Sequence, residues 1–301
     1  MDEFDILIVG TGAMACLFAA RLSAAKLRVM MLGTWIEGLQ ALRSQGVHVI
    51  NDEGEQVYSV RVSDNPKACE GAKLILVMVK AWQTEQAGQR LLQCIAPNAL
   101  VLTLQNGDGN FEKLSRHLGV NRVAVGATTL GATLLGPAIV HPAGDGVITL
   151  GIHSQLKPMA DLLGKAGFIV ETVPDISSVQ WGKLVINAAI NPLTALLRVQ
   201  NGELLKRASA RSVMTSTARE AAAVAVAQGV HLPYPDPVLA AEAIARRTAS
   251  NYSSMLQDIL RGAQTEIDFI NGAVVQVGER KGVPVAVNRT LWLLIKAAAG
   301  R

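Results

Sequence analysis

The first half of the chain alternates short apolar runs with segments of helix-forming residues. Residues 5–9 form an apolar run without an internal polar break, as expected of a strand buried on both faces. Helix formers fill residues 13–25, and residues 26–32 are predicted to be the second strand. The same criteria predict strands at 47–62 (a pair around a polar turn), 73–79, 99–104, 122–126, 128–134, 138–141, 147–150 and 167–173, and helices at 81–95 and 156–166. This alternation predicts an α/β fold with a mostly parallel, doubly wound sheet.

Beyond Pro174 the pattern changes to long alanine-rich stretches with helical spacing and no convincing strand. Helices are predicted at 177–191, 203–228, 235–248, 266–281 and 286–299. The change in pattern predicts two domains, an α/β domain over residues 1–174 and an all-helical domain over residues 175–301.

Local signals mark some of the helix ends in the second half. Ser254-x-x-Gln257 and Thr265-x-x-Asp268 resemble capping boxes, which are typical of helix starts. Pro192 disfavours helical geometry at Asn191, so the helix that contains them is expected to end or bend there.

The turn after the first strand carries a recognisable glycine pattern. Gly10, Gly12 and Ala15 match G-x-G-x-x-G/A, between a predicted strand and a predicted helix. Gly10 permits the tight turn, Gly12 lets the backbone approach a pyrophosphate, and Ala15 lets the helix lie close to the strand. An ordinary turn is the alternative, but the position at the N-terminus of a helix favours the binding of a dinucleotide cofactor.

The end of the second predicted strand bears on which dinucleotide is bound. An NAD-binding unit usually has Asp or Glu about 20 residues past the first glycine, whereas residues 32–35 are LGTW and the first carboxylate is Glu37. Nothing at this position would repel a 2′-phosphate, which favours NADP. The arginine that often holds this phosphate is also missing, and Thr34 and Arg43 are candidate substitutes.

Composition excludes several other classes of protein. With 301 residues and a net charge of +4, the chain is long enough for two cores and has no lysine–arginine cluster for nucleic acid. Its acidic first residues lead straight into a strand, and no apolar run is long enough for a membrane span, so we expect a cytoplasmic protein. Cys16, Cys69 and Cys94 lack the spacing of metal ligands and are expected to be reduced, so no metal site is predicted.

Polar residues follow two of the predicted strands. Lys80 with Gln83 comes after one strand, and Gln105-Asn106-Gly107 comes after the next. Ligands of open α/β sheets lie beyond the carboxyl ends of the strands, which favours a role in binding. The alternatives are a solvated lysine and ordinary Asn-Gly turn chemistry.

A second set of polar residues lies on the first helix of the helical half. Lys183, Asn187 and Asn191 are spaced at i, i+4 and i+8, which places them in one stripe among apolar residues. Such a stripe is either a binding face or a buried structural network. The same two readings apply to the polar residues Ser253, Ser254, Asp258, Glu266 and Asp268.

Over essentially its whole length the chain resembles the ketopantoate reductases (2-dehydropantoate 2-reductases). The resemblance lies in GTGAMA, VKAWQT (79–84), LQNGDGN (104–110), HPAGDG (141–146), WGKLVINAAINPLTAL (181–196), NGEL (201–204) and SSMLQDILRGAQTEIDFINGAV (253–274). It implies an NADPH-dependent reduction of ketopantoate to pantoate, on the route to pantothenate and coenzyme A. It also implies a Rossmann-type NADP-binding domain followed by a helical substrate domain, in a monomer or homodimer.

The resemblance also implies roles for individual residues. Lys183 matches the family's catalytic lysine and Glu266 its paired glutamate. The positions that match substrate contacts are Asn106, Lys183, Asn187, Asn191, Asn201 and Ser254. The positions expected at the cofactor are Gly10, Thr11, Gly12, Ala13, Met14, Ala15, Thr34, Lys80, Asn106, Ala132 and Glu266. Two departures stand out: Ala15 replaces the commoner third glycine, and Gly33-Thr34 stand where Arg or Lys often reads the 2′-phosphate.

The chemistry suits these residues. Hydride attack on a ketone builds negative charge on its oxygen, and a lysine ammonium can stabilise this charge and deliver a proton. Two alternatives remain open: a paralogue that acts on another 2-keto acid or in the oxidative direction, and a non-catalytic, nucleotide-responsive binding protein. The second would be expected to lose Lys183 or Glu266, and both are present.

Overall fold

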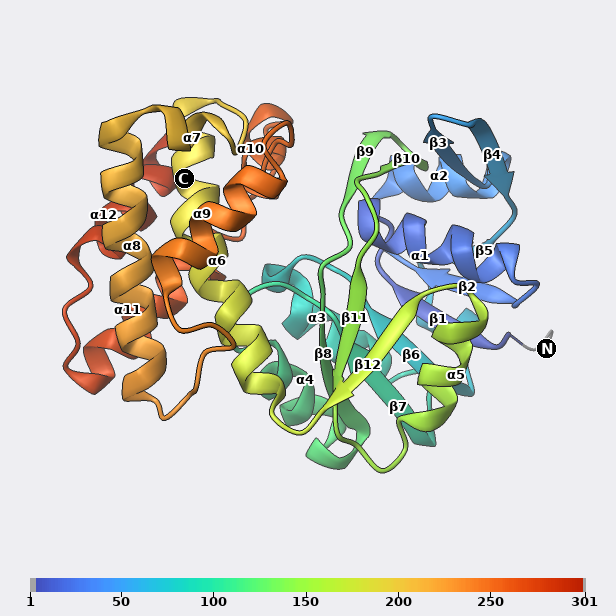
Figure 1. Cartoon of the computed structure of the whole chain (residues 1–301). Coiled ribbons are helices and arrows are strands. Elements are labelled where there is room, and N and C mark those ends of the chain that lie inside the picture. Colours follow the sequence, from blue (N-terminus) through green and yellow to red (C-terminus); the bar gives the residue numbers. More distant parts are fainter. Residues whose placement is uncertain (1–3, 300–301) are drawn as a thin grey trace. The chain divides into compact units, whose positions relative to one another are not determined.

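The structure is a computed structural model that describes residues 4–299. The chain divides into two compact units (Figure 1). Unit 1 contains the residues up to Gln105 together with Asn110–Ile176, and unit 2 contains Asn106–Gly109 and the residues from Ser177 onward. The short segment Asn106–Gly109 therefore belongs with the C-terminal helices, although it lies in the first half of the sequence.

Unit 1 is built on an eight-stranded sheet with the order β12-β11-β8-β7-β6-β1-β2-β5. Its strands are β1 (Ile6–Val9), β2 (Val29–Leu32), β5 (Arg61–Ser63), β6 (Ala72–Val77), β7 (Ile95–Thr103), β8 (Val123–Thr128), β11 (Val147–Gly151) and β12 (Ile169–Val173). All neighbouring pairs are parallel except β8 with β11. From β5 to β8 the chain order is that of a doubly wound dinucleotide-binding sheet, with its switch point between β1 and β6. The predicted α/β fold is confirmed.

The helices of unit 1 differ from the prediction in two respects. They are α1 (Ala13–Ala24), α2 (Ile36–Gln45), α3 (Thr84–Leu91), α4 (Asn110–Leu118) and α5 (Lys157–Lys165), with short 3₁₀ turns at Pro66–Cys69, Ala81–Gln83 and Val120–Arg122. The sequence analysis did not predict α2 and α4. The helix expected at 81–95 ends earlier, because β7 begins at Ile95 and carries Pro97 where the register between β6 and β7 shifts.

A second, four-stranded sheet packs on α1 in unit 1. Its order is β4-β3-β10-β9, with β3 (Val47–Asn51), β4 (Gly54–Tyr58), β9 (Ala132–Gly136) and β10 (Ile139–Pro142). The predicted pair of strands around a polar turn is confirmed as β3 and β4. Because α1 contacts β2 as well as this second sheet, its residues from Ala15 to Ala20 are all buried. The helix that follows the glycine turn is thereby held on two sides.

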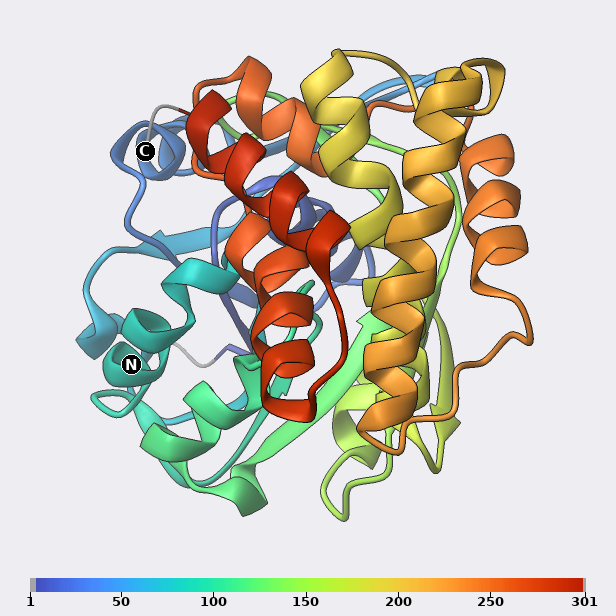
Figure 2. The ribbon, with the colours of Figure 1, turned by 90° about the vertical axis from the view of Figure 1, so that its left-hand side faces the viewer.

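Unit 2 is helical. It contains α6 (Ile176–Leu197), α7 (Glu203–Lys206), α8 (Ala208–Ala227), α9 (Pro237–Arg247), α10 (Ser254–Leu260), a 3₁₀ turn η4 (Ile267–Phe269), α11 (Asn271–Lys281) and α12 (Ala286–Ala298). Helices α8, α11 and α12 pack against one another (Figure 2). The stretches predicted as single helices at 203–228 and 266–281 are each divided, at Arg207 and at Ile270. Among residues 4–299, no helix is long and apolar enough to cross a membrane.

Helix α6 does not end at Asn191, so the end expected there is wrong. The helix runs through Pro192 to Leu197. Proline has no N–H, so the carbonyl of Ala188, one turn earlier, loses its helical donor. The side chain of Asn271 replaces this donor: its Nδ2 lies 3.0 Å from the Ala188 carbonyl oxygen and is fully buried. A tertiary hydrogen bond thus carries α6 across the proline.

Replacing Asn271 with alanine is expected to lower the free energy of unfolding by about 1–3 kcal/mol, because the Ala188 carbonyl would be buried without a donor. Gln276→Ala, on the exposed side of the same helix, is the matched control and should change it by less than about 0.5 kcal/mol. The measurement is urea unfolding followed by circular dichroism. Equal midpoints for the two variants would contradict this account of the proline.

Candidate functional site

Two glycines of the turn after β1 are required for different reasons. Gly10 has φ +130°, and a Cβ placed there would lie 2.9 Å from the backbone oxygen of Met78. A Cβ placed on Gly12 would meet no atom within 4 Å. The protein's own backbone therefore requires glycine at position 10. At position 12 there is open space, which leaves room for a ligand to approach the backbone.

The N-terminus of α1 is suited to bind an anion. Gly12 is its N-cap, and within the described chain the helix has no side-chain cap and no acidic residue in its first turn. The first N–H groups of a helix point along the axis with a partial positive charge, which is the usual phosphate site of a dinucleotide-binding unit. Ala13 and Met14 are partly exposed here, whereas Ala15 is buried.

Thr11, which was predicted at the cofactor, turns its side chain toward the end of β2. It is 6% exposed, and a Cβ placed on Gly33 would lie 2.6 Å from its Cγ2. The Thr11 methyl group therefore occupies the space that a side chain at position 33 would need. This explains why the strand-end position carries glycine. Thr34, the next residue, is exposed.

The two predicted polar clusters lie at the same edge of the sheet, because β6 and β7 are adjacent and parallel. The Gln83 Oε1 accepts a hydrogen bond from the Lys80 backbone N–H at 3.3 Å. Gln105 donates through Nε2 to the Val79 carbonyl and to the Thr84 hydroxyl, both at 2.8 Å. Gln105 thus ties the end of one strand to the loop that carries Lys80.

Asn106 lies in the segment that belongs to unit 2. The Asp108 N–H donates to the Phe269 carbonyl at 3.1 Å, and a Cβ on Gly107 would lie 2.7 Å from the Phe269 Cβ. Phe269 is the last residue of η4, which directly follows Glu266. The structure therefore brings the Asn106 turn against the segment that carries Glu266. Ala132, at the start of β9, instead packs against the core around α1 in unit 1.

The predicted stripe on α6 is confirmed as one face of a continuous helix. Asn191 is buried, and Lys183 and Asn187 are half-buried. Burial lowers the pKa of Lys183 to about 8, and the nearby Glu266 carboxylate acts in the opposite direction. Glu266 is itself buried, at 5% exposure. The structure thus places an ammonium group and a carboxylate together in unit 2, with the ammonium close to its titration range at neutral pH.

The part of this helix directly before Lys183 is held by residues that the sequence analysis did not single out. The Tyr234 hydroxyl donates to the Gly182 carbonyl at 2.8 Å, and burial raises the pKa of Tyr234. A Cβ on Gly182 would lie 2.7 Å from the ring of Pro233. These contacts fix the backbone directly before Lys183. Only the glycine before the lysine could have signalled such a close approach.

Ser253 and Ser254, at the start of α10, have roles that differ from the predicted ones. Ser253, not Ser254, is the N-cap: its Oγ accepts from the Leu256 N–H at 3.1 Å, so the capping box expected at Ser254 is wrong. The buried Thr194 hydroxyl on α6 lies 2.7 Å from the Ser253 Oγ. Ser254 is exposed at the first position of α10. Ser253 therefore anchors the segment and leaves the Ser254 hydroxyl accessible.

Asn201 is held in place by two hydrogen bonds, and its side-chain oxygen takes part in neither of them. Its backbone N–H donates to the Asn251 carbonyl at 3.0 Å, and its Nδ2 donates to the Thr248 hydroxyl at 2.9 Å. Its Oδ1 is buried and has no hydrogen-bond partner among residues 4–299. A buried acceptor without a donor is costly, and it is satisfied if a ligand hydroxyl or amide binds there.

The described residues contain no cluster of His, Cys, Asp and Glu that could hold a metal ion. The three cysteines are free and buried, and burial raises the pKa of each thiol.

Comparisons with known proteins identify the family to which the chain is similar. Residues 6–155 match the family model described as ketopantoate reductase PanE/ApbA, and residues 175–299 match its C-terminal model. The chain is 36% identical to 2-dehydropantoate 2-reductase of Archaeoglobus fulgidus (97% of this chain, 96% of the relative). It is 32% identical to the protein of that name from Vibrio cholerae (97% of each).

Solved structures show the same fold over the whole chain. A PanE/ApbA family ketopantoate reductase from Ralstonia eutropha superposes with a TM-score of 0.91 at 32% identity, covering 98% of each chain. A ternary structure of D-mandelate dehydrogenase with NADH and anilino(oxo)acetate superposes with a TM-score of 0.92 at 27% identity, also covering 98% of each. With both family models matched over most of its length, this chain belongs to the ketopantoate reductase family.

Proposed function

We propose that the protein is an NADPH-dependent 2-dehydropantoate 2-reductase, which reduces ketopantoate to pantoate on the route to pantothenate and coenzyme A. The observation that carries the proposal is the buried Glu266 beside Lys183, whose pKa is lowered to about 8. Relatives of this name are 36% and 32% identical over nearly the full chain. A lysine whose pKa is strongly lowered is typical of catalytic sites.

The turn of unit 1 fits a dinucleotide. Gly12 offers open space above its backbone, and the α1 N-terminus offers N–H groups to a pyrophosphate. When bound, the nicotinamide supplies a hydride to the ketone carbon. Gln105 and Gln83 hold the strand-end loop that carries Lys80, so that loop is ordered before the cofactor arrives.

Lys183 is the proposed acid. As the ketone is reduced, charge develops on its oxygen, and the Lys183 ammonium stabilises this charge and donates the proton to it. A pKa of about 8 keeps the lysine mostly protonated at pH 7, yet it makes the proton easier to give up than from an ordinary lysine. Glu266 offsets the cost of burying the ammonium and keeps it in place.

The amides of α6 and its neighbours are proposed to orient the keto acid. Asn187 and Asn191 present N–H donors that suit a carboxylate, and the exposed Ser254 hydroxyl can donate or accept. Asn201 Oδ1 is the acceptor that a substrate hydroxyl would satisfy. Ketopantoate has both a carboxylate and a hydroxyl, so it matches this set of groups. Fixed orientation supplies a large part of the rate enhancement.

A second candidate is a dehydrogenase for another 2-hydroxy acid. This candidate is favoured by the similarity of the fold to that of D-mandelate dehydrogenase, whose structure contains NADH. A non-catalytic nucleotide-binding protein is disfavoured because Lys183 and Glu266 are kept together and in a perturbed environment.

The test follows the absorbance of the reduced nicotinamide at 340 nm with purified protein. We expect fast oxidation of NADPH with ketopantoate and much slower oxidation with the 2-keto acid that corresponds to mandelate. Faster turnover of the latter would assign the second candidate. No turnover of any 2-keto acid, with a dinucleotide bound, would refute both enzymatic assignments.

A further inference from the structure

The candidate cofactor site lacks the strand-end side chain that usually contacts the ribose 2′ position. In dinucleotide-binding units the residue at the end of the second strand contacts the ribose 2′ position, through a carboxylate for NAD or a nearby arginine for NADP. Here that position is Gly33, and the Thr11 methyl group leaves no room for a side chain. A group that contacts the 2′ position must therefore come from a residue other than Gly33.

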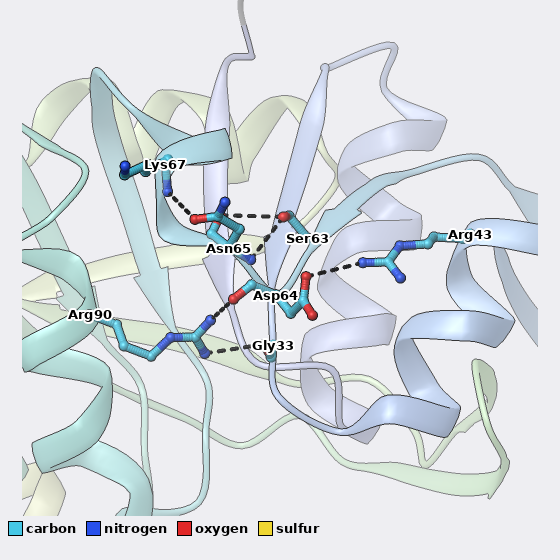
Figure 3. Close-up of polar contacts among 7 residues, drawn as sticks. All are labelled: Gly33, Arg43, Ser63, Asp64, Asn65, Lys67 and Arg90. Carbon is cyan, nitrogen blue, oxygen red and sulfur yellow. Dashed lines mark hydrogen bonds and ion pairs between the residues drawn. The ribbon is translucent and has the colours of Figure 1, made fainter.

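An arginine on helix α3 lies close to Gly33. Arg90, on α3, donates through one terminal nitrogen to the Gly33 carbonyl at 3.1 Å and through the other to the Asp64 carbonyl. Gly33 directly follows β2, and Asp64 directly follows β5. Figure 3 shows the guanidinium of Arg90 turned toward the ends of these two neighbouring strands. The two carbonyls fix the plane of the guanidinium at the carboxyl edge of the sheet.

The charges around Arg90 leave it available to an anion. Asp64 is the acidic side chain in the cluster of Figure 3, and its carboxylate is paired with Arg43 of α2 at 3.4 Å. Arg90 itself meets the backbone of Asp64, not its carboxylate. Guanidinium has five N–H donors, and the two carbonyls use two of them. Three donors remain, and guanidinium donors of this kind bind phosphate oxygens.

We propose that Arg90 binds the 2′-phosphate of NADPH and so sets the cofactor preference, in place of the missing strand-end arginine. This inference rests on the proposed function only in that the cofactor is a nicotinamide dinucleotide. The competing explanation is that Arg90 is a strut, which ties α3 to the ends of β2 and β5 without touching the cofactor. The two explanations differ in one respect: a strut supports NADH and NADPH equally.

The experiment compares Arg90→Gln with the wild-type protein. By calorimetry, the wild-type protein should bind adenosine 2′,5′-bisphosphate more tightly than AMP, and Arg90→Gln should remove most of this difference. For turnover, kcat/KM with NADPH should fall by about 10- to 100-fold, and kcat/KM with NADH should change by less than about threefold. Arg116→Gln, which removes an exposed arginine of α4, is the control and should leave the ratio of the two cofactors unchanged.

Several results would overturn the proposal. Equal losses with NADPH and NADH would identify Arg90 as a strut, and no loss with either cofactor would exclude it from the 2′ position. Equal binding of the bisphosphate and AMP by the wild-type protein would mean that no 2′-phosphate is recognised. If Arg90→Gln unfolds, Arg90→Lys keeps the charge without the fork and should still lose NADPH preference in part.

The inference and the proposed function can fail separately. Arg90-dependent binding of the bisphosphate without turnover of ketopantoate would uphold the 2′-phosphate site and refute the assigned substrate. Turnover of ketopantoate with no dependence on Arg90 would do the reverse.

Discussion

Replacing Lys183 with alanine is expected to lower kcat for ketopantoate reduction by about 10²- to 10⁴-fold, the usual contribution of a general acid. The KM for the dinucleotide should change little, because the glycine turn proposed to bind it lies in unit 1 and the lysine in unit 2. Steady-state kinetics at pH 7 measures both quantities. Lys281→Ala, at an exposed position in the last turn of α11, is the matched control and should retain full activity. Wild-type turnover by Lys183→Ala would exclude the lysine as the acid.

The pH dependence of the wild-type enzyme is a second test of Lys183 as the proton donor. Since only the ammonium form donates a proton, kcat/KM for reduction should fall as the pH rises through about 8, the pKa of Lys183. The oxidation of pantoate should show the opposite sign, because it needs the neutral amine. Residual activity of Lys183→Ala should lack this transition.

Substitution of Gly12 with valine is expected to weaken dinucleotide binding by at least about 100-fold while leaving the melting temperature unchanged. A Cβ at position 12 meets no protein atom within 4 Å, so the side chain enters the space through which a phosphate would reach the α1 N-terminus. Gly10→Ala is the informative contrast. Its positive φ and the close Met78 carbonyl should make it lose both binding and stability, by about 1–3 kcal/mol of unfolding free energy.

Fluorescence titration with the reduced dinucleotide and thermal unfolding together separate the two glycines. A Gly12→Val protein that binds normally would show that the pyrophosphate lies elsewhere. A Gly10→Ala protein of normal stability would show that the turn relaxes without cost.

Periodicity and local signals were sufficient for the sheet, most helices and the α6 stripe, because these depend on neighbours in sequence. They failed where distant residues decide the outcome. Pro192 should have ended α6, but Asn271, 83 residues away from Ala188, satisfies the freed carbonyl. The helices α2 and α4 span only 10 and 9 residues, shorter than the window of about 11–18 residues over which helical periodicity is judged.

The candidate site shows the same division. The glycine turn, Lys183 and the asparagines of α6 could be found from spacing and resemblance. The capping of α10 by Ser253 instead of Ser254 could not be found in this way, because the contact of Ser253 with Thr194 joins two helices. Nor could Arg90, whose two carbonyl partners follow strands 57 and 26 residues earlier in the chain. No motif marks an arginine that reaches the site from the side of the sheet.

The fit between Thr11 and Gly33 also constrains how cofactor preference can evolve in this chain. A single mutation that places arginine or aspartate at position 33 puts its Cβ 2.6 Å from the Thr11 methyl carbon, and selection would meet a folding defect before any gain in recognition. A smaller residue at position 11 must come first, at a position that also shapes the phosphate turn. Variation at position 90 carries no such prerequisite, so lineages that share Thr11 and Gly33 are expected to change their dinucleotide preference through α3.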